Sequence, residues 1–323
     1  MPSPSRTLLV ALVAIASLGL SSAGQAAPGK RSGPVRRAPP PAGPWDKATA
    51  ATFFTDAFGE LDGERPDFAR SSATRGPGDE TAVATVASGA GGFKWSALVS
   101  EGTLTDEVKD RRGLVAEAIG SPSGFKGGGY DKARQAYSAV ALAFGVIAAY
   151  DGDVRWKKDA ATARDLFARV GFNCKVGTDQ SFAESKARFE DLEALLEGNQ
   201  PQGKPERDED FAWSQVAARP ALMQRLEEAE KLLGASTADK GDFTKAAERI
   251  LHEAEMVAVI GEVIQQSDFE YHDDDTYRGY SSAMRDAAVQ VREAVKKGDY
   301  EAARSGVGSL KKSCDACHGD YRS

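Results

Sequence analysis

The chain has 323 residues, of which 41% are hydrophobic, 8% aromatic and 28% charged. This apolar content is enough to build a core, so the composition excludes a chain that is disordered throughout. The net charge of −7 argues against nucleic acid as a partner, because phosphate binding needs a basic face. The long apolar run over residues 8–20 is shorter than the roughly 20 residues of a membrane helix, which argues against an integral membrane span.

The first 27 residues have the layout of an export signal. Arg6 precedes the apolar run, and small residues dominate positions 21–27, as in a cleavable secretory signal. The alternative is an uncleaved anchor. We therefore predict a signal peptide over residues 1–27 and a periplasmic or otherwise exported protein.

The next segment carries few helix signals. Residues 28–45 are rich in Pro and Arg, which predicts an extended linker. A short helix is predicted within residues 46–60. Residues 61–92, rich in Gly, Ser, Ala and Thr, are predicted to be mostly loop.

The rest of the chain contains an internal repeat. The pattern F-x-W-S at residues 93–96 recurs at 211–214, and the apolar residues that follow each Trp keep the same spacing. Further along, Arg164-Asp165 recurs as Arg285-Asp286. Two unrelated helical stretches with a common period are the alternative, but the coincident spacings favour duplication. The predicted domains are residues 46–205 and 206–323.

Each half is predicted to contain four amphipathic helices. In the second half they span roughly residues 212–233, 243–266, 276–296 and 299–321, with apolar residues in steps of three and four. No segment shows the period-two alternation of a strand. The expected fold is all-α, with two tandem antiparallel four-helix bundles.

The last predicted helix contains the candidate site for a bound group. Cys314, Cys317 and His318 form C-x-x-C-H, the attachment signature of c-type haem, in which two thiols form thioethers and the histidine binds iron. The alternatives are a zinc half-site, a redox C-x-x-C and a structural disulfide. Zinc needs four ligands and a thioredoxin-like site needs a βαβ context, so we predict one covalent haem c.

The second half resembles cytochrome c′, a family of four-helix bundles with haem near the end of the chain. Tyr321-Arg322 after the motif matches the family ending C-x-x-C-H-x-x-[YF]-R. Arg219 and Met223, four residues apart, match the place of the family's haem-facing distal residue. The resemblance covers about residues 206–323. It implies that Arg219 and Arg322 lie near the haem, and that Met223 is a candidate sixth ligand of the iron.

The first half lacks the motif and is predicted to be a haem-less bundle of the same type. Its expected role is to pair with the haem half, as two bundles pair in the family's dimers, or to offer a docking surface; a homodimer is the other arrangement considered. Cys174 is expected to be a buried, inert thiol, with an intermolecular disulfide as the alternative. His252 and His272 are expected to be solvated, and the acidic residues after His272 to form a solvated turn.

The sequence leaves two functions open. One is electron transfer with a redox partner protein, and the net negative charge of the chain leaves room for a basic partner. The other is the binding of small gases such as NO and CO at an open or displaceable sixth position. No enzyme activity is expected, because no residue stands out as a distal acid or base.

Overall fold

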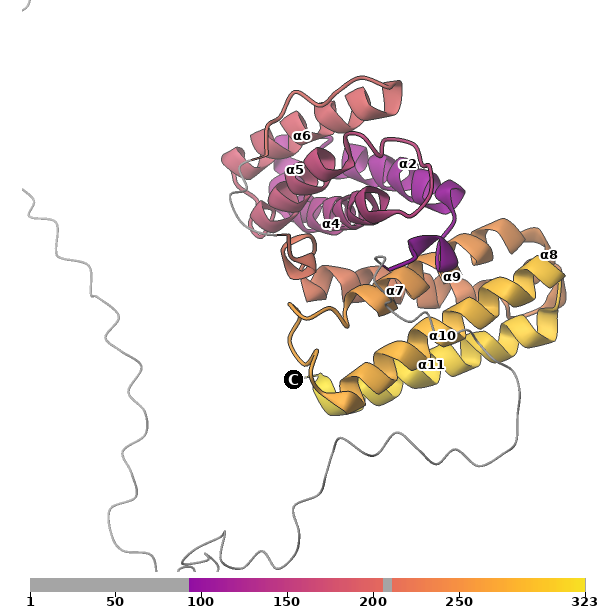
Figure 1. Ribbon diagram of the computed structural model, residues 1–323. Helices are drawn as coiled ribbons and strands as arrows, with labels where there is room; N and C mark the ends of the chain where they lie inside the picture. Colours follow the sequence, from indigo (N-terminus) through magenta and orange to yellow (C-terminus); the bar gives the residue numbers. More distant parts are fainter. Residues whose placement is uncertain (1–92, 206–210, 323) are drawn as a thin grey trace, which may run out of the picture. The chain divides into compact units, whose positions relative to one another are not determined.

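The computed structural model describes residues 93–205 and 211–322 (Figure 1). All of these residues belong to one compact unit, residues 79–323. The predicted export signal, linker, short helix within 46–60 and loop over 61–92 lie outside the described residues.

The described part of the first half consists of four long helices with short turns between them. The elements are η2 (Trp95–Ala97), α2 (Glu101–Ala118), α3 (Pro122–Gly124), η3 (Phe125–Gly129), α4 (Tyr130–Ala149), α5 (Ala160–Asn173) and α6 (Asp179–Glu197).

The second half repeats this order. Its elements are η4 (Trp213–Gln215), α7 (Arg219–Ser236), α8 (Lys240–Lys245), α9 (Ala247–Val263), α10 (Asp275–Lys297) and α11 (Tyr300–Tyr321). The described residues form helices and turns without any strand, which confirms the all-α prediction of two tandem four-helix bundles.

Two predicted boundaries in the second half differ from the structure. The helix predicted over residues 212–233 begins only at Arg219, after a 3₁₀ turn. Pro220 lies in its first turn, where the missing N–H costs nothing. The helix predicted over residues 243–266 is interrupted at Ala246, so that α8 and α9 are separate.

The last two helices follow the prediction closely because both ends are capped. Asp274 accepts hydrogen bonds from the backbone N–H groups of Thr276 and Tyr277 at the start of α10. Gly298 ends that helix with φ +68°, a left-handed conformation that glycine adopts without strain. Asp299 then caps α11 by accepting from Ala302 N–H.

Neighbouring helices pack against each other within each half. In the first half α4 lies against α2 and α5, and α6 lies against α5 and α2. In the second half α10 lies against α9 and α11, and α7 lies against α9 and α11. A single hydrophobic core cluster runs through both halves. None of the helices in the described ranges is long and apolar enough to cross a membrane.

The repeat found in the sequence has a structural counterpart. Helices α2 and α7 are each 18 residues long and follow a 3₁₀ turn that opens with a buried Trp. After that Trp, the backbone N–H of Ser96 donates to Asp151, and that of Ser214 donates to Asp268. Each Asp lies in the connection after its half's second long helix. Equivalent side chains therefore make the same local bonds in both halves.

Candidate haem-attachment site

The C-x-x-C-H motif lies on the last two turns of α11. Cys314 and Cys317 are half-buried and packed against the core, while His318 is exposed. The three-residue spacing continues the stripe of buried residues that begins with Ala303, Val307 and Leu310 on the same helix. Both thiols consequently lie on the inward face of α11, and the imidazole follows immediately.

Burial keeps both thiols neutral. It raises the pKa of Cys314 to about 11, and the nearby carboxylate of Glu230 acts in the same direction. Burial also raises the pKa of Cys317, although the charge of Arg219 opposes the shift. Neither thiol forms a disulfide, so both sulfur atoms are available for another bond.

Helix α10 faces the motif with a mixed set of side chains. Cys314 Sγ lies 3.9 Å from Met284 Sδ. The buried face of α10 continues from Met284 to Ser281 and Tyr277, while the antiparallel α11 continues from Cys314 to Cys317. The hydroxyl groups of Tyr277 and Ser281 are buried on this face of α10, and Ser281 acts on the pKa of Tyr277. The buried part of the site is therefore partly polar.

A cluster of aromatic rings lies at this end of the bundle. The ring of Tyr321, three residues after His318, has its centroid 5.3 Å from that of Tyr277 and 5.1 Å from that of Tyr271. Arg219 at the start of α7 lies over the rings of Tyr271 and Tyr277, with its guanidinium carbon 5.3 Å from each centroid. The position expected from the resemblance thus brings Arg219 close to the motif.

Met223 lies one turn further along α7. It is half-buried and packs against the core. Lys311 of α11 pairs with Glu230 of α7 at 3.3 Å. The first and fourth helices run antiparallel in such a bundle. Seven residues before Glu230 on α7 lies Met223, and seven residues after Lys311 on α11 lies His318. The two residues therefore share one level of the bundle.

Arg322 follows the end of α11. Its backbone N–H donates to His318 O at 3.3 Å, and its side chain is exposed. Its charge helps to lower the pKa of Glu227 on α7, although the hydrogen bond from Lys231 is the main cause of that shift. Arg322 thus stands one turn from His318 and faces the α7 side of the site.

These residues fit a haem c better than the alternative groups. Two free inward-facing thiols, three residues apart and followed by an imidazole, are the donor set that thioether attachment requires. Within residues 93–205 and 211–322, no group of three or more His, Cys, Asp or Glu side chains is arranged to hold a metal ion. Cys174 is buried in the other half, where its thiol lies 3.2 Å from Ser185 Oγ. That burial agrees with the predicted inert thiol.

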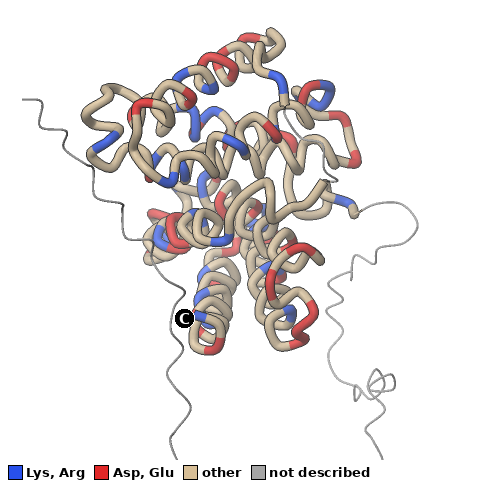
Figure 2. The backbone as a smooth tube through the Cα atoms, turned by 90° about the vertical axis from the view of Figure 1, so that its left-hand side faces the viewer, with Lys and Arg blue, Asp and Glu red and all other residues tan. Residues whose placement is uncertain are grey.

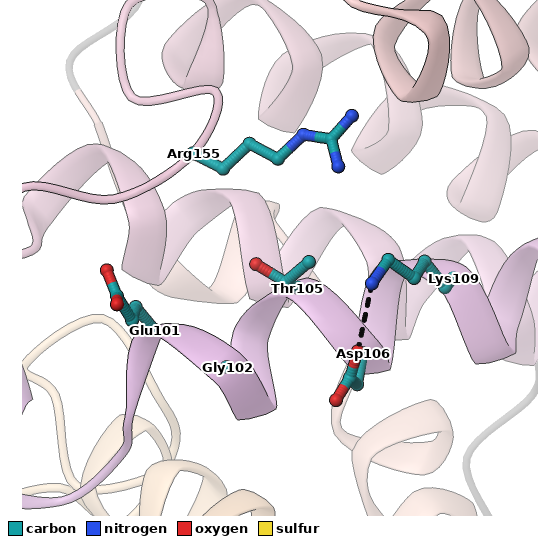
Figure 3. A pocket seen from close by; sticks show the side chains of 6 residues that line it. All are labelled: Glu101, Gly102, Thr105, Asp106, Lys109 and Arg155. Atoms are coloured by element: carbon teal, nitrogen blue, oxygen red, sulfur yellow. Dashed lines mark hydrogen bonds and ion pairs between the residues drawn. The ribbon is translucent and has the colours of Figure 1, made fainter.

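The last helix of the first half has no cysteine and buries leucines near its end. Near the end of α6, Leu192 and Leu195 have the same spacing as the two cysteines and are fully buried. Trp156 covers this end, and its Nε1 donates to Leu195 O at 2.7 Å. The position equivalent to Met223 is Thr105, which lines a polar depression with Glu101, Asp106, Lys109 and Arg155 (Figure 3). Neither thiols nor a thioether meet there.

The prediction for His252 was wrong. This histidine is buried, and its Nε2 lies 2.8 Å from Glu107 Oε2 in the other half. Its partner Glu107 is fully buried and also accepts hydrogen bonds from Arg111 and Arg225. His252 therefore belongs to a buried polar network between the halves. His272 is half-exposed, and its Nδ1 lies 2.9 Å from Phe269 O.

Sequence reasoning missed the contacts made by two groups of residues. The spacing of apolar residues did not show that Tyr271 and Tyr277 meet Arg219. The network around Glu107 joins residues far apart in the chain, and charged residues at helix positions usually indicate a solvated face. Acidic residues also surround the tyrosines, in the loop before α10 and at Asp320. In Figure 2, red segments lie beside the end of the chain marked C.

A four-helix bundle with C-x-x-C-H in its last helix has the features of a c-type haem protein. In agreement with that class, residues 214–322 match the family model described as cytochrome C′. The resemblance is thereby confirmed over this part of the chain, and the family implies haem c. Searches of curated proteins and of solved structures found no match.

Proposed function

We propose that the protein is an exported monohaem c-type cytochrome that transfers electrons to or from a partner protein. The thiols of Cys314 and Cys317 would each add across a vinyl group of the haem to form a thioether, and the imidazole of His318 would bind the iron. The observation that carries the proposal is the pair of free, inward-facing thiols next to an imidazole, in the last helix of a segment that matches the cytochrome C′ model. Haem supplies an iron that takes up and releases one electron.

The surrounding side chains tune this site. Arg219 and Arg322 bring positive charge to two sides of the motif, and Tyr277 and Ser281 supply hydroxyl groups in its buried part. The proposal assigns no catalytic residue. His252 is engaged by Glu107 and His272 by the backbone of its own loop, so neither serves as a distal acid or base.

Whether Met223 binds the iron separates electron transfer from gas binding. Its common level with His318 on the facing helix supports a role as the sixth ligand, and His/Met ligation raises the reduction potential toward values useful in electron transfer. The second candidate function is the binding of NO or CO at an open sixth position. It is supported by the packing of Met223 against the core, since methionine often only fills space.

One optical comparison tests both functions. With Met223 as ligand, the ferric protein is low-spin and has a weak band near 695 nm, roughly where thioether-to-iron transitions fall; Met223→Leu abolishes that band. Met256→Leu, on the buried face of α9, is the matched control and leaves the spectrum unchanged. A high-spin ferric spectrum that Met223→Leu does not alter, together with direct CO binding, contradicts ligation and favours gas binding.

We infer that the protein is exported and works with a basic partner. Residues 1–27 act as the export signal, and attachment takes place outside the cytoplasm. The acidic residues near the tyrosine cluster favour a basic redox partner. An iron-to-protein ratio of one in the purified chain tests the monohaem assignment, and a ratio of two contradicts it.

A further inference from the structure

Two contacts join residues that hold the same position in the two halves. Trp95 and Trp213, the residues that open the repeat, have ring centroids 5.2 Å apart. Glu107 on α2 and Arg225 on α7 are 118 residues apart, the same offset that relates the two helices, and are joined by hydrogen bonds of 2.8 and 3.0 Å. A position that touches its own counterpart lies on a two-fold axis. The halves therefore face each other as the subunits of an isologous dimer do.

The helix packing has the same symmetry. The second long helix of the first half, α4, lies against α7, and the second long helix of the second half, α9, lies against α2. Exchanging the two halves exchanges these two pairs. Ser100, the N-cap of α2, donates from both its backbone N–H and its hydroxyl to Glu255 of α9 at 2.9 Å. The interface is thus made by the first two long helices of each half.

The charges at this interface are not symmetric. Glu107 accepts three hydrogen bonds from the second half, two from Arg225 and one involving His252 Nε2. Arg225 also donates to Glu253 on its own side. Burial alone would raise the pKa of Glu107, but the charge of Arg225 and the bond to His252 hold it well below its usual range. At the axis the first half places the carboxylate of Glu107, which Arg111 of the same half also contacts, and the second half places the guanidinium of Arg225.

We infer that this face is built to pair the two unlike halves of one chain and to reject a second copy of either half. Two first halves would bring Glu107 against Glu107, and two second halves would bring Arg225 against Arg225. Either pairing removes the hydrogen bonds that cross the axis and leaves like charges buried in contact, which is strongly unfavourable. The occupant of the α7 and α9 face is the chain's own haem-less half, and the chain is a particle of one polypeptide.

The oligomeric state of the intact chain tests the rejection of a second copy. Sedimentation equilibrium over a wide concentration range is expected to return the mass of one chain, 34.2 kDa before any processing. A particle with the mass of two chains overturns the inference.

Hydrogen exchange tests the pairing itself. Arg225→Gln changes only α7, yet it is expected to lower the protection of amides in α2 by about 10- to 100-fold, because the buried Glu107 loses both hydrogen bonds and the charge of Arg225 and keeps only Arg111 and His252. The control is Lys231→Gln, which removes a charge from the exposed side of α7, where Lys231 pairs with Glu227; it leaves α2 unchanged. Unchanged α2 protection in Arg225→Gln overturns the inference.

A milder variant covers the case in which Arg225→Gln does not fold. Arg225→Lys keeps the charge but loses the two-pronged contact with Glu107. The protection of α2 is then expected to fall by a smaller factor, about 10-fold. Protection of α2 equal to that of the wild type in this variant overturns the inference as well.

Discussion

Replacing Glu107 by Gln removes a fully buried negative charge that the first half contributes to the network between the halves. The side chain keeps its shape and one acceptor oxygen, but Arg111 and Arg225 lose a carboxylate that both contact. Both arginines retain another partner, Glu228 and Glu253 respectively. The cost is therefore expected at the lower end of the range for breaking a buried ion pair, about 3 kcal/mol.

This loss is large enough to measure as a melting temperature. For a folded unit of this size, 1 kcal/mol lowers Tm by about 2–4 °C, so Glu107→Gln is expected to lower Tm by about 6–12 °C at pH 7. Circular dichroism of the helices during heating gives the value. The matched control is Glu228→Gln, which also removes a carboxylate from Arg111 but at a side chain that is 45% exposed; its cost is expected to stay below about 1 kcal/mol. Equal shifts for the two variants would refute the reasoning.

Four further outcomes follow from the structure. Acid should destabilise the wild type more than the Glu107→Gln variant. Because the pKa of Glu107 is lowered in the folded chain, its carboxylate stabilises the fold fully above the unfolded pKa of about 4.3, and this stabilisation is lost as pH falls below that value. Equal acid sensitivity of the two proteins in urea titrations would contradict the assignment. Replacing both motif cysteines by Ala should leave no haem on the protein after acid–acetone extraction. Arg322→Ala should keep the haem but shift its reduction potential or the pKa of a ligand. An unchanged potential and an unchanged pH titration would show that Arg322 is merely a solvated residue. Gly145→Ala should cost about 1–3 kcal/mol because the new Cβ would lie 2.9 Å from Trp213, whereas Gly113→Ala, with open space around it, should be neutral or stabilising in the same melts.

The elements that the sequence predicted well are those whose signals are local. Helices α10 and α11 begin and end within one residue of the predictions, because an apolar stripe is joined to an Asp cap and to the turn at Gly298. The break at Ala246 was missed, since alanine is the best helix former and nothing in its neighbourhood signals a stop. The haem motif was found because its three residues are adjacent in the chain.

The parts that escaped prediction depend on contacts between distant residues. His252 meets Glu107, 145 positions away, and hydrophobic periodicity on either helix carries no information about that meeting. The same holds for Arg219, whose guanidinium lies over Tyr271 in the loop before α10 and over Tyr277 in α10. The repeat in the sequence indicated that the two halves have the same fold. It did not show how they pair, because that depends on side chains that differ between the halves, such as Glu107 and Arg225.

The separation of 118 residues between Glu107 and Arg225 also has a consequence for the order of folding. Inside each half, helices that follow each other in the chain pack together, so most of their contacts close smaller loops than the contact between the halves, and we expect them to form earlier. The contact between α2 and α7 closes a much larger loop, and it needs both bundles to present their first two long helices. Until that docking step, Glu107 and Arg225 remain hydrated. We therefore expect the desolvation of these charges to fall late in folding, where it opposes the joining of incompletely formed bundles.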